Sequence, residues 1–155
     1  MKKNLLLVSF LISVGLLMFS FRESAEMKGK CTGEEEYAVG LTKVVPFKLI
    51  KDYRISLSSG TPTDPPADFF MISLKSGLKY RLLPINNPEN KTKMIMSIYQ
   101  NEKKSVLLAT SFNKTTGKHF PYVDFNCKTT GTFALFFEFE GAAKGCGVGM
   151  FAVEN

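Results

Sequence analysis

The side chains that could carry out chemistry are few and widely spaced. The sequence has one histidine, His119, and no serine or cysteine in a recognisable nucleophile motif stands beside it. Glu138 and Glu140 alternate along an expected strand, which places their carboxylates on one face about 7 Å apart. Paired carboxylates can hydrolyse glycosides, but neighbouring glutamates on a solvated face usually serve solubility. We therefore expect no catalytic residues and a protein that is not an enzyme.

Motifs for cofactors and metals are also missing from the sequence. There is no glycine loop that would cradle a phosphate and no zinc-protease helix. No cysteine or histidine pair has the close spacing of a zinc site. We therefore expect no cofactor and no metal ligands.

The segment 112–122 (FNKTTGKHFPY) is the strongest candidate for a ligand-binding site, because function tends to lie on loops held by a rigid scaffold. Phe120 and Tyr122 flank a proline that would stiffen them, and Lys118 and His119 add hydrogen-bond donors. Aromatic faces beside donors suit sugars or peptides. The alternative is that Phe120 and Tyr122 are the first core residues of the next strand.

Three cysteines in an exported chain suggest one disulfide and one spare thiol. Cys127 and Cys146 flank an expected strand, whose length separates them by roughly 20–25 Å at about 3.3 Å per residue. A disulfide needs Cα atoms within about 7 Å. We therefore predict that Cys31 pairs with Cys127 or Cys146. The alternative is three reduced, buried cysteines.

The first 25 residues have the order of a secretory signal peptide. Lys2 and Lys3 are followed by an apolar run, 5–21, and then by Arg22 and Glu23. The alternative is an uncleaved anchor, because a run of this length is close to the lower limit for crossing a bilayer. Both interpretations predict export, to the periplasm or to the extracellular side of the cell surface. Contact with a membrane is expected only through an uncleaved leader.

The charge balance does not point to a nucleic acid. Lys and Arg number 20 and Asp and Glu number 14, which gives a net charge of +6. The basic residues form no long run and accompany no nucleic-acid-binding motif. We interpret the excess as a solvated basic surface and expect no nucleic-acid partner.

Hydrophobic patterning predicts one mostly β domain. Residues 26–46 contain a short helix at about 33–43. From residue 47 onward apolar and polar residues alternate, as in strands with one buried and one solvated face. Gly, Pro and Asn interrupt the pattern about every ten residues, which gives about eight strands. We expect them at 47–57, 68–74, 78–84, 93–100, 105–110, 120–127, 132–140 and 146–153. We therefore predict an all-β, jelly-roll-like antiparallel sandwich over 47–155, after a signal peptide (1–25) and an N-terminal segment (26–46).

Several segments of this pattern are similar to those of bacterial jelly-roll modules. They are 68–70 (DFF), 75–81 (KSGLKYR), 97–100 (SIYQ), 106–110 (VLLAT), 123–125 (VDF), 130–133 (TGTF) and 149–151 (GMF). Over 68–153 the chain resembles the bacterial pre-peptidase C-terminal (PPC) domain family. Its segment 144–149 (KGCGVG) also resembles small uncharacterised exported β-sandwich proteins of Bacteroidetes type. The resemblance implies a jelly roll without catalytic residues. The family usually accompanies a secreted protease, and the sequence contains no protease domain.

These observations favour a non-catalytic binding or accessory module of the bacterial envelope or surface, with a protein or glycan partner. The alternative is a structural subunit of an envelope complex, which would need a contiguous exposed apolar patch. A small hydrolase is the third hypothesis, and it would need polar groups that converge in a pocket.

Overall fold

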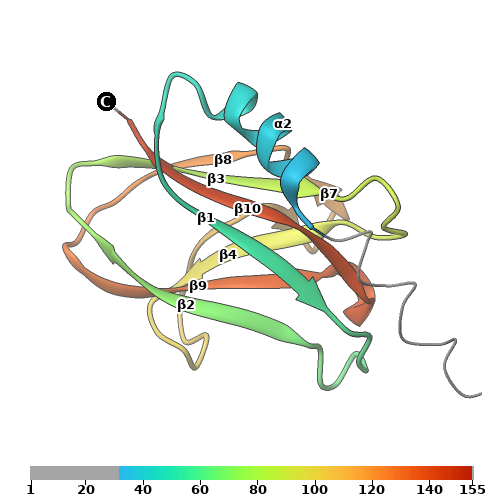
Figure 1. Ribbon diagram of the computed structural model, residues 1–155. Coiled ribbons are helices and arrows are strands. Elements are labelled where there is room, and N and C mark those ends of the chain that lie inside the picture. The colour runs from blue at the N-terminus through green and yellow to red at the C-terminus, as the bar shows by residue number, and fades with distance from the viewer. Residues whose placement is uncertain (1–31, 155) are drawn as a thin grey trace, which may run out of the picture. The chain divides into compact units, whose positions relative to one another are not determined.

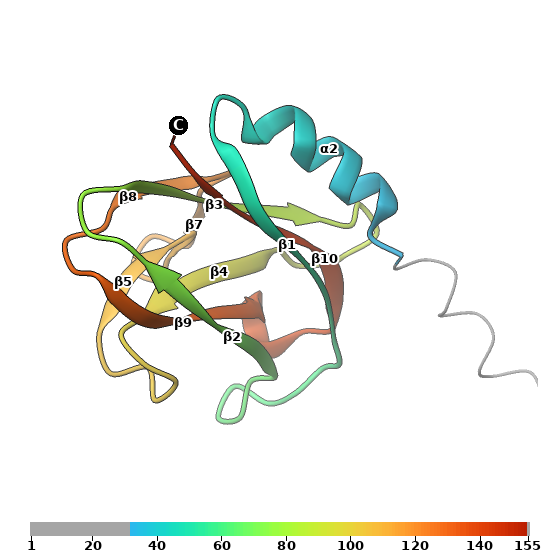
Figure 2. The same ribbon diagram turned by 60° about the vertical axis from the view of Figure 1, so that its left-hand side comes forward.

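The computed structural model describes residues 32–154, which form two sheets and one α-helix (Figures 1 and 2). The leader prediction and Cys31 lie outside these residues. The helix α2 spans Glu34–Val44, and the short 3-10 helix η1 spans Glu140–Ala142. The strands are β1 (Lys48–Leu57), β2 (Ala67–Leu74), β3 (Lys79–Asn86), β4 (Met94–Tyr99), β5 (Leu107–Thr110), β6 (Phe112–Asn113), β7 (Lys118–His119), β8 (Val123–Asn126), β9 (Gly131–Phe139) and β10 (Gly145–Val153). Neither described helix has the length and apolar character needed to span a bilayer.

Eight of the strands form two antiparallel four-stranded sheets. The first has the order β1-β10-β3-β8 and the second β2-β9-β4-β5, while β6 and β7 pair as a small separate hairpin. If the eight main strands are numbered consecutively, these orders become 1-8-3-6 and 2-7-4-5, which is jelly-roll connectivity. The predicted antiparallel sandwich is confirmed. The main strands match their expected ranges closely, and the β6–β7 hairpin was not predicted.

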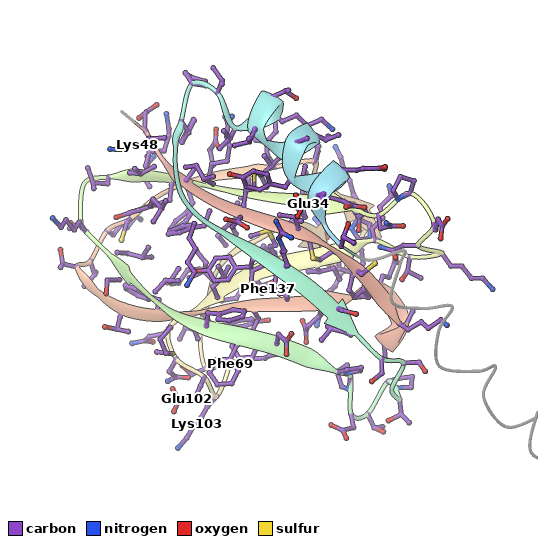
Figure 3. The ribbon with its side chains drawn as sticks, viewed as in Figure 1. Glu34, Lys48, Phe69, Glu102, Lys103 and Phe137 are labelled. Carbon is purple, nitrogen blue, oxygen red and sulfur yellow. The ribbon has the colours of Figure 1, made fainter. Side chains whose placement is uncertain are left out.

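In the core between the sheets, glycines of one strand lie opposite large apolar side chains of another. The inward face of β9 carries Phe133, Leu135, Phe137 and Phe139, which are all buried. The facing strand β10 has glycine at alternate positions, and a Cβ atom at Gly149 would overlap the Phe137 ring. Figure 3 labels Phe137 in this space and Phe69 on the other side of its sheet. Because β10 lacks side chains at these positions, the large rings of β9 fit between the sheets.

The helix α2 covers the outer face of the first sheet. It packs on β3 and β10, and a second buried cluster fills the interface: Val44, Phe47, Leu83, Ile85, Val148, Met150 and Ala152. Gly40 lets the helix approach closely, since a Cβ atom there would overlap the side chain of Met150. The helix therefore buries the outer face of the first sheet over β3 and β10, whereas the second sheet carries no helix on its outer face (Figure 1).

Candidate functional site

The uncovered outer face of the second sheet exposes large apolar side chains from both of its edge strands. Phe69 and Met71 of β2 are 47% and 50% exposed, and Leu107 of β5 is 49% exposed. Strand alternation causes this, because Phe70 and Ile72 turn toward the core and their neighbours turn away from it. An exposed apolar surface of this kind is a candidate for contact with another molecule. We call it the aromatic face.

Two aromatic contacts hold the centre of the aromatic face. Phe136 of β9 points outward and stacks on Phe69, with ring centroids 5.1 Å apart. Tyr99 of β4 meets Phe136 edge to face at 5.5 Å. Contacts of this geometry restrict the motion of the rings. Phe136 itself is buried beneath these neighbours, so it holds the exposed ring of Phe69 and the half-buried ring of Tyr99 in place. Rings held in this way lose little conformational entropy when a partner covers them.

A charged pair borders these rings. Lys104 lies in the β4–β5 hairpin and forms an ion pair with Glu138 of β9. The ammonium of Lys104 lies 4.6 Å from the centroid of the Phe136 ring, within the range of a cation–π contact. Burial raises the pKa of Tyr99, and the carboxylate of Glu138 raises it further. The pair thus supplies polar groups of both signs beside an apolar surface.

A groove of about 400 Å³ lies on the same face. Most of its lining is apolar and comes from four segments, namely Ile95 and Tyr99 of β4, Leu107 of β5, Phe112 of β6 and Phe120. Lys114 and Glu138 also line it. The groove can accept an apolar side chain of a partner while charged groups contact the polar atoms around it.

A second hollow, of about 490 Å³, lies against α2, β3 and the start of β4. His119 lines it, and its Nε2 atom lies 3.0 Å from a carboxylate oxygen of Glu140. Glu36 also lines it and accepts a hydrogen bond of 2.6 Å from the side-chain amide of Asn87. His119 and Glu36 are therefore engaged with neighbouring side chains that do not line the hollow, and Glu35, Lys43 and Lys93 add further charged groups to its lining.

The four residues predicted to bind a ligand do not converge on one site. Lys118 and His119 form β7, and Lys118 lies 5.3 Å from the ring of Phe120. Phe120 lines both hollows, but His119 lines only the larger one. Tyr122 lines neither and packs on the guanidinium of Arg81 at 4.4 Å. The structure thus places Phe120 in the lining of the groove of the aromatic face, and the other three residues do not line that groove.

Arg81 accounts for the position of Tyr122. Its guanidinium lies between the rings of Phe47 and Tyr122, 4.0 Å and 4.4 Å from their centroids. It donates two hydrogen bonds to Asp124, at 2.7 Å and 2.8 Å, and this contact raises the pKa of Arg81. The arrangement links β3 to β8 and to the residue before β1. Tyr122 therefore has a packing role in this cluster.

The other chemically notable residues are also separated. Glu138 and Glu140 contact different partners, since Glu138 forms an ion pair with Lys104 and Glu140 lies 3.0 Å from Nε2 of His119. Cys127 is a buried free thiol that donates a hydrogen bond to the carbonyl of Thr129. This leaves Cys146 as the predicted partner of Cys31, and that pairing stays a prediction. Within residues 32–154, no group of three His, Cys, Asp or Glu side chains could hold a metal ion.

Sequence reasoning missed the aromatic face as a site. One signal was available, because Phe69, Phe70 and Met71 are consecutive and a half-solvated strand should alternate. Phe136 gave another, since it lies in the same alternation as Glu138 and thus on the solvated side. In both cases the sequence places an apolar residue on the strand face that the alternation of apolar and polar residues assigns to solvent.

Comparison with known proteins adds no identity to these observations. No protein-family model matches the chain, and none of the curated proteins matches it significantly. The structural evidence on function therefore consists of the aromatic face, its groove and the residues that line them.

Proposed function

We propose that this protein is an exported, non-catalytic binding module that contacts a partner protein through its aromatic face. The observation that carries the proposal is the contrast between the two sheets. The centre of one outer face is covered by α2, whereas the other outer face exposes Phe69, Met71 and Leu107 around the buried ring of Phe136. The signal-like order of the first 25 residues supports export to the periplasm or cell surface.

The chemistry of the aromatic face favours a protein over a glycan. The centres of protein interfaces are enriched in aromatic residues and methionine, and their rims are polar. Here Phe69, Met71 and Tyr99 supply the apolar part, and the Lys104–Glu138 pair supplies charges. The mainly apolar groove suits a side chain that anchors a partner, as interface hot spots do.

The test is affinity purification of the protein from the envelope of its host, with and without Leu107→Lys. This substitution puts a charge in the groove. We expect wild type to recover a partner protein and to bind that partner directly once both are purified. We expect Leu107→Lys to abolish this recovery. Val45→Lys is the matched control, because Val45 is also an exposed apolar residue but follows α2 on the other sheet. It should leave recovery unchanged.

Two outcomes would overturn this proposal. Recovery that is the same for wild type and Leu107→Lys would show that the groove is not the contact. A glycan array that detects binding sensitive to Leu107→Lys, with no protein recovered, would show that the partner is a glycan. A partner that always remains bound in fixed stoichiometry would favour the structural-subunit alternative over reversible binding.

A further inference from the structure

The sandwich has four edge strands, and β2 is the least protected of them. β1 contains four charged residues and a register shift between Leu49 and Lys51. β5 and β8 have four residues each. β2 has eight residues, pairs with β9 without a register shift, and contains neither lysine nor proline. A long, regular, apolar edge strand is a ready template for pairing with another strand.

The apolar residues of β2 are exposed on both faces of the strand. Phe69 and Met71 belong to the outer face, whereas Phe70 points inward beside Tyr53, with ring centroids 4.6 Å apart. Phe70 is nonetheless 37% exposed, because it lies at the open side of the sandwich. A partner lying on the outer face alone would leave Phe70 exposed. A strand added at the edge would cover all three residues, since its own side chains alternate between the two faces.

We propose that β2 pairs antiparallel with β2 of a second copy of this chain, which joins two sheets into one of eight strands. A two-fold axis at Phe70 would place Phe69 opposite Met71 of the second copy on the outer face. This register covers the three exposed residues with one another and adds a methionine–aromatic contact. It also makes the interface isologous, as in most homodimers.

The charges around β2 favour this arrangement. Asp68 is the only charged residue in β2, and Lys75 follows the end of the strand. Antiparallel pairing brings Lys75 of each copy toward the acidic end of the other, whereas parallel pairing would bring like charges together. Asp68 would face Ile72 of the second copy, so the two Asp68 carboxylates lie about 13 Å apart, beyond the screening length of physiological salt. An equivalent pairing of β1 about its middle would place Lys51 of each copy opposite Arg54 of the other.

The inference does not depend on the proposed function, because it is tested on the purified protein alone. The protein is produced with its own leader and its mass is measured by analytical ultracentrifugation over a range of concentrations. We expect a dimer. Met71→Lys should weaken it at least tenfold, because the substitution places like charges close together across the two-fold axis. Leu107→Lys is the matched control, since it makes the same change on the same face at the opposite edge, at nearly equal exposure.

Hydrogen exchange provides the second measurement and does not require a variant. Amides of 67–74 that face the free edge should exchange more slowly at high protein concentration than at low concentration, whereas those of 107–110 should not change. A protein that stays monomeric at its highest soluble concentration would overturn the inference. A dimer that withstands Met71→Lys, or that Leu107→Lys weakens equally, would also overturn it.

Discussion

Replacement of Gly149 by alanine tests the packing on which the sandwich depends. A Cβ atom at this position would overlap the ring of Phe137, which is fully buried. Overpacking of this kind costs about 1–3 kcal/mol. For a domain of this size, that loss lowers Tm by about 4–12 °C. Thermal and urea unfolding, both followed by circular dichroism, measure the two quantities.

Two further variants test whether the loss of stability in Gly149→Ala comes from the steric overlap or from a general effect of alanine in a strand. At Gly131 the nearest atom to an added Cβ is 3.6 Å away, on Phe133, so Gly131→Ala should change stability by less than about 1 kcal/mol. Phe137→Leu should relieve the overlap, so the double variant with Gly149→Ala should lose less than the sum of the single losses, by at least about 0.5 kcal/mol. Strict additivity, or a Gly149→Ala variant as stable as wild type, would refute the packing argument.

Three other predictions concern single interactions. Asp124→Ala should cost about 3 kcal/mol in urea unfolding, because it leaves the nearly buried Arg81 guanidinium without its two acceptors. The raised pKa of Tyr99 means that the folded state keeps the phenol proton to higher pH than the unfolded state, so this residue makes stability fall as pH rises above about 10. Glu138→Gln should lower the pKa of Tyr99 in an absorbance titration, although burial, the larger cause, remains. Cys127 should resist a thiol reagent until the protein unfolds, since it is buried.

Each of these predictions has a control. For Asp124→Ala the control is Glu154→Ala, which breaks the solvent-exposed ion pair with Lys79 and should lower the free energy of unfolding by less than about 1 kcal/mol. An equal loss of stability in the two variants would contradict the reasoning. A Tyr99→Phe variant identifies the contribution of that residue to the absorbance titration, and an unchanged titration curve would refute the assignment. Peptide mapping without reduction should join Cys31 to Cys146. A bond between Cys127 and Cys146 would contradict both the free thiol and the strand between them.

Local pattern was sufficient to predict the elements of the fold. The main strands and α2 follow from alternation, turn residues and a single helical segment, which act over a few residues. The β6–β7 hairpin was missed because its strands have two residues each, too few for alternation to be recognised. The loop that contains the hairpin lines the groove of the aromatic face through Phe112 and Phe120.

The site was less predictable because it depends on residues far apart in the sequence. Phe69 and Phe136 stack only because β2 pairs with β9, and nothing local to either residue specifies that pairing. Tyr122 is predicted to bind a ligand, and the structure adds a contact that no local pattern indicates, namely the guanidinium of Arg81 against its ring. The residue is still 48% exposed, and ligand binding stays a prediction. An aromatic residue in a loop has the same local signature whether its neighbour is solvent, a ligand or an arginine.

The sequence by itself determined that the chain forms an antiparallel β-sandwich, because the period of two and the turn residues are properties of neighbouring positions. Only the tertiary structure decided which sheet α2 covers, which strands lie at the edges and which apolar residues stay exposed. Those outcomes depend on the order of strands in each sheet and on the fit between β9 and β10. They arise from contacts between distant segments, which a local pattern does not encode.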